Sequence, residues 1–446
     1  MLSFVANQLS SSPRLHLHQG PWRVLASTEW GFPELKRSMS GSSMVDGEVV
    51  TSDSFGNRLI RLRLQVYRGG DPDAALAELE KLHRELTRPR NMLKYQPASK
   101  PVWFRTFRAV PESLQIYRNG DYFEVSVEIP AEPFAYGERE TAINGVSIGM
   151  DPASGMYHDI TNVKGDVETP LQVIIQGVVA PGFTSAMAIR RRGTPSQMPF
   201  VVQAESMTTG TNTSVQPNDP AMSGSGSNYV ATSFGTPTNE IRLSMSAFPA
   251  AASPDARGFY RVYARVRRTE SSGTITMQLN ANKPVTVPNS TSIRMIELGE
   301  VAVPGGMDPI VAGPSDVELP AQRSSGLQIR AARSSGSSWL HYDCFIFMPA
   351  DADTDRFALV TWPNVNSGFH VFDGPSGAVY NLHSSSSAVM GYAASFEGLP
   401  LMVSPGQTNR LFFIRKVNDL ADALSDSVTV TAHYWPRYLY VPGVES

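Results

Sequence analysis

The run Arg58-Leu-Ile-Arg-Leu-Arg-Leu-Gln-Val-Tyr67 decides how the first third of the chain folds. Between Leu59 and Tyr67, apolar side chains alternate with arginine and glutamine, which is the period of two that a half-buried β-strand shows. Gly69-Gly70 follows and breaks the strand. The neighbouring segments can therefore be placed against one long strand that has an apolar face and a polar face.

A helix is predicted directly after this strand. Asp71 is suited to the N-cap, Pro72 to the first helical position, and Asp73 places a carboxylate near the positive helix end. Apolar residues then recur with helical spacing on one face, at Ala75, Leu79, Leu82 and Leu86. The helix should end at Arg88-Pro89, because the residue before a proline avoids the helical region.

A strand pair is predicted after the helix. Asn119-Gly120 lies between two alternating runs, 114–118 and 121–129, and this dipeptide is a strong signal for a tight β-hairpin. A further strand is predicted at 103–110. The order of strand, helix, strand and hairpin predicts an α+β unit in which a single helix packs against a sheet.

The composition of the whole chain favours several β-rich domains. Its 446 residues are too many for one hydrophobic core, and its 35 glycines and 33 prolines are typical of short strands joined by turns. The net charge of −3 predicts no general attraction to nucleic acid or to an anionic membrane. The sequence has no apolar run long enough for membrane insertion, and its single cysteine, Cys344, excludes an intrachain disulfide.

An ordered series of segments runs through residues 1–140, namely Asp46-Gly47, the strand Arg58–Tyr67, the helix, Met92-Leu93-Lys94-Tyr95, Trp103-Phe104-Arg105-Thr106 and Ala131-Glu132-Pro133-Phe134-Ala135-Tyr136. This series resembles the hub domain of distal tail proteins of long-tailed bacteriophages. The resemblance implies a structural virion protein at the tail tip, in a homo-oligomeric ring that is usually a hexamer. The implied partners are the tail tube protein and the proteins associated with the tail tip and tape measure, with DNA only passing through the lumen.

A second domain is predicted from two separated segments, 141–198 and 351–446. Gly165-Asp166, followed by a Thr-Pro pair and a β run, resembles the second, β-sandwich domain of the same family. The later segment has strands joined by a Pro-Gly turn in the same style. Because the first segment is too short to close a sandwich alone, a discontinuous β-sandwich is expected.

The segment 199–350 has many short strands between Gly, Pro and Ser turns, which predicts a jelly-roll β-sandwich inserted in a loop of the second domain. Its opening at 203–205, its alternating strand at 258–267 and its end at 339–347 resemble a galactose-binding-like carbohydrate-binding module. The chain as a whole is thus predicted to be mainly β and multi-domain, with an α+β hub domain, a discontinuous β-sandwich and an inserted jelly roll.

The resemblance of this insert implies two kinds of site. In such modules an early glutamate and a late aspartate often help to hold a structural calcium, which points to Glu205 and Asp343. Loop aromatics and an asparagine bind sugar there, which points to Asn228, Tyr229 and Trp339, since aromatic faces cover the apolar side of a sugar ring and an amide bonds its hydroxyls. Alternatives remain open, because Tyr229 begins a strand and could be core, Trp339 could plug a strand edge, and the other oxygen ligands of calcium are unidentified.

The sequence has no recognisable catalytic constellation, neither a phosphate-binding loop nor a zinc-ligand spacing nor a nucleophile in a strand-turn-helix setting. The hub resemblance therefore implies a structural virion protein and not an enzyme, with the inserted module expected to contact host cell-surface or cell-wall glycans. The alternative is a soluble glycan-binding protein, or the accessory module of a polysaccharide-active enzyme. That alternative rests on the insert alone.

Overall fold

The computed structural model describes most of the chain. The described ranges are 1–8, 12–41, 48–67, 71–97, 100–153, 155–177, 183–190, 200–223, 228–234, 239–245, 258–303, 327–334, 339–350, 355–362, 368–383, 388–392 and 395–441. Asp46-Gly47, the first segment of the series that resembles the hub domain, lies outside these ranges.

Two compact units make up the chain. Unit 1 consists of Met1–Glu140, Lys164–Thr169 and Trp435–Ser446, and unit 2 consists of Thr141–Val163 and Pro170–Tyr434. Unit 2 thus contains most of the two segments expected to form the sandwich and all of the segment expected to form the insert. The two short later pieces of unit 1 had been assigned to the sandwich from the sequence.

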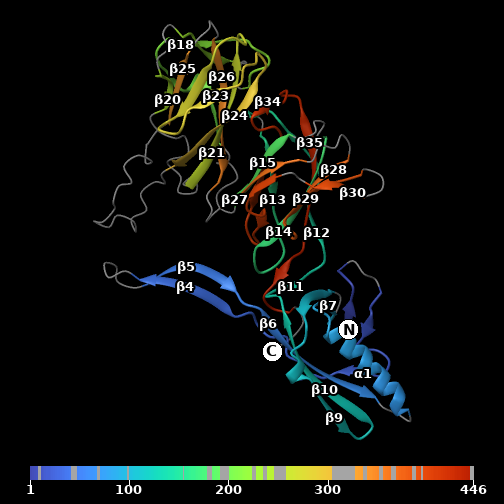
Figure 1. Cartoon of the computed structure of the whole chain (residues 1–446). Coiled ribbons are helices and arrows are strands. Elements are labelled where there is room, and N and C mark those ends of the chain that lie inside the picture. The colour runs from blue at the N-terminus through green and yellow to red at the C-terminus, as the bar shows by residue number, and fades with distance from the viewer. Residues whose placement is uncertain are drawn as a thin grey trace. The chain divides into compact units, whose positions relative to one another are not determined.

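Within the described residues, a ten-stranded antiparallel sheet forms the centre of unit 1 (Figure 1). Its main path runs through β2 (Leu15–His16), β1 (Leu2–Val5), β7 (Arg90–Tyr95), β8 (Val102–Phe107), β10 (Tyr122–Ala131), β6 (Arg58–Tyr67) and β3 (Trp22–Val24). Three short strands pair beside this path, namely β9 (Gln115–Asn119), β11 (Ala135–Tyr136) and β36 (Arg437–Tyr438).

Strand β6 and helix α1 (Pro72–Leu86) confirm the first elements predicted from the sequence. The apolar side chains of β6 are all buried, at Ile60, Leu62, Leu64 and Val66. At the helix start, Asp71 Oδ1 accepts hydrogen bonds from the backbone N–H groups of Asp73 at 3.1 Å and Ala74 at 3.2 Å. Leu82 and Leu86 pack into the same core as the β6 side chains, so the capped helix covers one face of the sheet.

Two hairpins stand out in unit 1. The β9–β10 hairpin turns at Gly120, which has φ +57°, and confirms the strand pair predicted around Asn119-Gly120. Strands β4 (Leu35–Gly41) and β5 (Glu48–Phe55) form a separate two-stranded sheet that extends away from the main sheet (Figure 1). The sequence analysis did not predict this second hairpin.

The end of the chain is held in unit 1 by pairing and by a buried arginine. Strand β36 pairs with β11, with Tyr438 opposite Ala135. The Arg58 side chain is buried and donates from Nε to the carbonyl of Pro133 at 2.8 Å and from Nη2 to that of Leu439 at 2.9 Å. These contacts explain why residues 435–441 belong to unit 1.

Two sheets of unit 2, the sandwich sheets, come from residues on both sides of the insert. The larger has β12 (Glu140–Gly149), β35 (Ser427–Tyr434), β14 (Thr169–Gln176), β28 (Phe369–Asp373), β29 (Ala378–Leu382), β30 (Val389–Tyr392) and β32 (Met402–Val403). The smaller has β13 (Tyr157–Ile160), β33 (Asn409–Ile414), β15 (Thr184–Arg190), β27 (Asp355–Thr361) and β31 (Ser395–Gly398).

Two further sheets, the jelly-roll sheets, come almost entirely from the segment predicted as the insert. The larger has β18 (Thr213–Gln216), β19 (Tyr229–Thr232), β26 (Leu340–Pro349), β21 (Gly258–Arg268), β24 (Arg294–Val303), β34 (Asp419–Leu420) and β16 (Phe200–Gln203). The smaller has β17 (Thr208–Thr209), β20 (Glu240–Met245), β25 (Leu327–Arg333), β22 (Ile275–Leu279) and β23 (Val285–Val287).

The larger jelly-roll sheet takes one strand from outside its own segment. Strand β34 lies between the sandwich strands β33 and β35 in sequence, yet it pairs with β24, with Leu420 opposite Arg294. One continuous hydrophobic core cluster also includes residues of both pairs of sheets. The predicted fold class, mainly β with several domains and one helix, is confirmed in the described residues.

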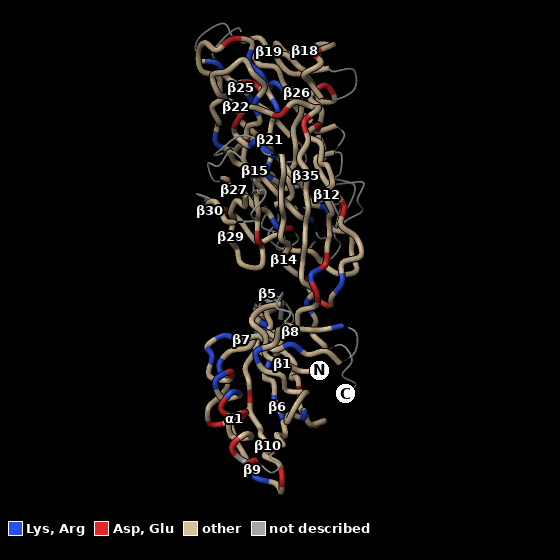
Figure 2. The backbone as a smooth tube through the Cα atoms, turned by 90° about the vertical axis from the view of Figure 1, so that its right-hand side faces the viewer, with Lys and Arg blue, Asp and Glu red and all other residues tan. Residues whose placement is uncertain are grey.

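Charge is distributed evenly over the trace. Figure 2 shows acidic and basic residues interspersed in both units, without a long run of one sign. This distribution agrees with the small net charge of −3. Among the described residues, no helix combines the length and the apolar character that crossing a membrane requires.

Candidate functional site

The residues predicted to bind sugar lie along two paired strands of the larger jelly-roll sheet. Tyr229 begins β19 and, like Asn228 before it, is half-buried, whereas Trp339 directly precedes β26 and is 44% exposed. In the β19–β26 register, Thr232 lies opposite Leu340. Tyr229 and Trp339 are therefore at opposite ends of the pairing, roughly 13 Å apart along the strands at about 3.3 Å per residue.

His341 lies between Tyr229 and Trp339, and these three residues are called the row below. Its ring lies 4.6 Å from that of Tyr229 at an interplanar angle of 36°, and its two-residue spacing from Trp339 places both on one face of the strand. His341 Nδ1 lies 3.2 Å from Arg267 Nη2, and Arg267 pairs with Asp219. Burial first, and the charge of Arg267 second, lower the pKa of His341 to about 4, so the imidazole is neutral at pH 7.

This row can contact a sugar mainly through Trp339. One face of the Tyr229 ring is already covered by His341, while the Trp339 side chain is open to solvent. Sequence reasoning missed His341, Arg267 and Asp219. The sequence held no signal for them, because the register of the β21–β26 ladder is what places His341 opposite Arg267.

The two residues predicted to hold calcium lie close enough to interact electrostatically, but Asp343 is already paired. Asp343 is fully buried, and its Oδ1 accepts from Ser223 N at 2.7 Å and Ser223 Oγ at 3.0 Å, while Arg265 pairs with Oδ2. Burial, and then the charge of Asp343, raise the pKa of Glu205, whose buried Oε2 has no hydrogen-bond partner in the described residues.

These residues fit a cation poorly as they stand. The Arg265 guanidinium takes the place of the positive charge that calcium would supply at Asp343. No cluster of three or more His, Cys, Asp or Glu side chains suited to a metal occurs in the part of the chain that the structure describes, and calcium requires six to eight oxygen ligands. Calcium at Glu205 and Asp343 stays a prediction.

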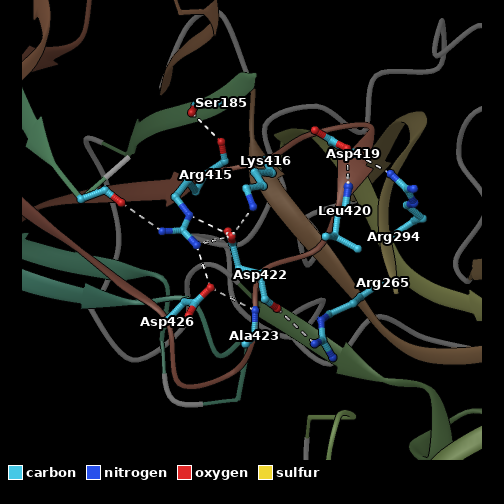
Figure 3. Close-up of polar contacts among 11 residues, drawn as sticks. Ser185, Arg265, Arg294, Arg415, Lys416, Asp419, Leu420, Asp422, Ala423 and Asp426 are labelled. Atoms are coloured by element: carbon cyan, nitrogen blue, oxygen red, sulfur yellow. Dashed lines mark hydrogen bonds and ion pairs between the residues drawn. The ribbon is translucent and has the colours of Figure 1, made fainter. Parts of the chain in front are cut away.

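A cluster of ion pairs joins the jelly-roll sheets to the sandwich sheets within unit 2. Figure 3 shows Arg415 directed at Asp422 and Asp426, and Arg415 Nη2 lies 2.8 Å from Asp426 Oδ2. On the other side, Arg265 Nη2 donates to the carbonyl of Asp422 at 3.3 Å, and Arg294 pairs with Asp419 at 3.0 Å. The segment 415–426 is therefore bonded to both pairs of sheets, and it is called the clasp below.

Further buried arginines strengthen the same connection. Arg190, on the sandwich strand β15, donates to the Tyr260 hydroxyl of β21 at 2.6 Å and lies 3.7 Å from Asp355. Arg261 of β21 pairs with Glu397 of the sandwich strand β31 at 2.8 Å. The jelly-roll segment is thus fixed to the sandwich by contacts of its folded surface.

Unit 1 has two exposed apolar patches on different elements. The tip patch, at the β9–β10 hairpin, consists of Tyr67, Ile116, Tyr117 and Tyr122. The arm patch, at the base and along the first strand of the β4–β5 hairpin, consists of Phe32, Leu35, Met39 and Tyr440. The Phe32 and Tyr440 rings meet edge to face with centroids 5.5 Å apart. Strand β9 also pairs only with β10 in the described residues, so its other edge is open.

No protein-family model matches the chain, and no curated protein matches its sequence. Among solved structures, the chain is similar to the SPP1 Dit protein, described as a paradigm of hub adsorption apparatus in phages that infect Gram-positive bacteria, with 10% identity, 98% of each chain covered and a TM-score of 0.36. It is also similar to a chain of the phage P2 baseplate in its activated conformation, with 8% identity, 76% of this chain and 96% of that chain covered, and a TM-score of 0.25.

A third similar structure is a Paenibacillus xanthan lyase, with 11% identity, 88% of this chain and 36% of that chain covered, and a TM-score of 0.23. Since all three TM-scores are below 0.5, these likenesses by themselves assign no function to the chain.

Proposed function

We propose that the protein is a structural component of a phage virion, located at the tail tip, where copies of it form a ring between the tail tube and the tip proteins. The observation that carries this proposal is the pair of exposed apolar patches on unit 1. Contiguous exposed apolar surface usually marks a contact site. Two different patches on one subunit are what a head-to-tail ring requires, because each contact buries one patch of each kind.

In this proposal the tip patch of one copy meets the arm patch of the next. The open edge of β9 supports such a contact, since an unpaired strand edge offers a row of N–H and C=O groups for pairing with another chain. Six copies are the number that the hub resemblance implies. The low and evenly distributed charge suits a lumen through which DNA passes, because a strongly basic channel would hold the phosphates.

The jelly-roll segment is proposed to contact glycans of the host surface. The exposed indole of Trp339, with the half-buried Tyr229 and Asn228 at the other end of the β19–β26 pairing, supports a weak sugar contact. A ring would present several copies of this contact at once, and linked weak contacts reach a much higher overall affinity. The soluble glycan-binding protein remains the alternative if no ring forms.

Electron microscopy and mass photometry of the purified chain across a range of concentrations test the ring. We expect closed rings for the wild type, and loss of rings for Tyr117→Asp in the tip patch and for Phe32→Asp in the arm patch. An equal mixture of the two variants should give dimers, since only one pair of intact patches remains. Val215→Asp, at an exposed valine of unit 2, should still form rings.

Two results would overturn the ring. One is single copies at every concentration, both alone and with the purified tail tube protein of the same virion. The other is rings that both patch variants still form as readily as the wild type.

A further inference from the structure

The two jelly-roll sheets leave an opening at one side, where β23 edges the smaller sheet and β24 is next to last in the larger. A pocket of about 660 Å³ lies there, lined by the turn 282–288 and by residues 296–300 of β24. A smaller hollow of about 240 Å³ shares Asn282 and Glu300 with it. We infer that these hollows form one groove, the side groove, which binds a neutral saccharide chain.

The lining combines an apolar floor with hydrogen-bonding groups. Asn282 Nδ2 donates to the carbonyl of Glu300 at 2.8 Å, and the amide oxygen has no partner in the described residues. The Thr286 hydroxyl and the Lys283 ammonium are exposed and likewise have no partner there. The accessible apolar part of the lining consists of the half-buried Val285 and Pro288, whereas the side chains of Ile296 and Leu298 belong to the core. Hydroxyls and ring C–H groups of one sugar need both kinds of surface.

The backbone of β24 is shaped around this lining. A register shift in the β21–β24 ladder leaves Leu298 as an extra residue, and Gly299 has φ +102°. A Cβ at Gly299 would lie 2.9 Å from Asn282 Nδ2, so a side chain there would displace the amide. Bulges of this kind re-aim side chains and are frequent beside binding sites.

The side groove is completed by a residue of the clasp. Asn418, which belongs to the segment 415–426, lines the larger pocket, and its Oδ1 accepts from the backbone N–H of Glu297 at 3.0 Å. Its φ of +57° is a conformation that asparagine tolerates better than most residues. The groove therefore needs the sandwich as well as the jelly-roll sheets, and the segment 199–350 alone would lack part of it.

The charges of the side groove balance, which favours an uncharged occupant. Glu297 and Glu300 both pair with Arg261, at 3.6 and 3.3 Å, and share its guanidinium with Glu397 of β31. Burial is the main cause that raises the pKa of Glu297. With Lys283 as the remaining cation, neither sign dominates, so an anionic polymer gains little, whereas hydroxyls can bond to both carboxylate and ammonium groups.

Phe259 gives the side groove an aromatic surface at one end. Its side chain is 49% exposed and lines the smaller hollow beside Asn282. An exposed aromatic ring can cover the apolar face of a sugar ring. The length from Phe259 through the shared Asn282 to the larger pocket suits a chain of several sugar units better than a single one.

This inference rests on the proposed glycan contact of the jelly-roll segment, but it assigns the contact to other residues and does not require the ring. It is tested on the full chain by fluorescence anisotropy with end-labelled tetra- to hexasaccharides of glucose, galactose or N-acetylglucosamine. We expect binding of at least one probe, with affinity about tenfold weaker in Thr286→Trp, which fills the groove, and in Phe259→Ala.

Two controls make the test specific. Thr209→Trp places the same bulk on β17, the opposite edge strand of the smaller jelly-roll sheet, and should bind like the wild type. Trp339→Ala compares the side groove with the Trp339 contact proposed above, and it should weaken binding less than Thr286→Trp does. Thermal unfolding of each variant shows whether it is folded.

The inference is overturned if Trp339→Ala abolishes binding while Thr286→Trp and Phe259→Ala retain it, in which case the row at Trp339 is the sugar site. It is also overturned if no probe binds the wild type. That second result removes the glycan contact altogether and leaves the ring assay unaffected.

Discussion

Unit 1 leaves large apolar side chains in solvent at its hairpins, whereas unit 2 encloses arginines between its sheets. In the described residues, the smaller unit 1 has more exposed large apolar side chains than unit 2. Unit 2 in turn has most of the buried arginines, namely Arg190, Arg242, Arg265, Arg268, Arg410 and Arg415. In the proposed ring, unit 1 supplies the contacts with other copies, whereas the buried arginines of unit 2 bond within the unit.

The physical reason for the difference lies in what each kind of contact costs. An exposed apolar patch costs little in the monomer and stabilises an assembly by about 25 cal/mol per Å² of apolar surface that it buries. A buried arginine is costly to desolvate and stabilises the fold only when its partners are in place. Buried ion pairs therefore fix the geometry between the sandwich and jelly-roll sheets, which would hold a glycan-binding surface in one orientation on each copy.

The largest expected effect is the loss of a buried partner in unit 2. Arg265→Met leaves the Asp343 carboxylate buried without its cation, and we expect a loss of about 3–5 kcal/mol in the free energy of unfolding at pH 7. Urea unfolding measures it. Arg267→Met is the matched control, because its partner Asp219 is more exposed, and it should cost about 1 kcal/mol or less.

The double variant Arg265→Met/Asp343→Leu should recover most of this loss, since it removes both charges together. Adding calcium to Arg265→Met tests whether Asp343 can bind a cation. If added calcium restores the stability of Arg265→Met, then Asp343 can hold a cation once its arginine is gone. A loss below about 1 kcal/mol in the single variant would contradict the contrast between the units, because the pair would then behave as a surface ion pair.

The second largest expected effect is a dependence of the stability of unit 2 on pH. Burial lowers the pKa of His370 to about 4 from an ordinary 6.5, and its ring lies 5.2 Å from Trp362 and 5.9 Å from Phe183. Between pH 6.5 and 4, the unfolded state binds a proton at His370 and the folded state does not. The free energy of unfolding is therefore highest above this range and falls as the pH drops through it. The maximum loss is about 3 kcal/mol.

His370→Phe should flatten the pH dependence, because an aromatic ring of similar size keeps the packing against Trp362 and removes the titrating group. Urea unfolding of the wild type and the variant at pH 7 and 4.5 measures the difference. His341, with its pKa also lowered to about 4, should contribute in the same direction. Equal slopes for wild type and variant would show that His370 is protonated in the folded state and that this core is open to water.

The sequence predicted the elements whose signals are local and missed those that depend on distant partners. Strand β6, helix α1 and the β9–β10 hairpin follow from alternation, capping residues and an Asn-Gly turn, which lie within a few positions of the elements that they specify. The pairing of β34 with β24 could not be predicted, because two residues carry no periodic pattern. The positions of Tyr229 and Arg267 beside His341 depend on strand register, which one sequence does not determine.

The smallest expected effect concerns Arg58, which is the exception in unit 1. Its guanidinium is buried like those of unit 2, but it donates to the backbone carbonyls of Pro133 and Leu439 instead of a carboxylate. Burial lowers the pKa of Arg58 to about 10. The cost of desolvating the guanidinium therefore offsets part of the stabilisation that its hydrogen bonds contribute. Arg58→Met should therefore cost unit 1 only about 1 kcal/mol.

The local consequence of this change should be larger than the global one. Without the bond to Leu439, the segment 435–441 keeps the β36–β11 pairing and the hydrogen bond from Leu439 N to Asp166 Oδ2 at 2.9 Å. Hydrogen exchange of this segment should accelerate several-fold in Arg58→Met while exchange in α1 stays unchanged. If α1 accelerates equally, Arg58 supports the whole core of unit 1, and the buried charge then plays the same part in both units.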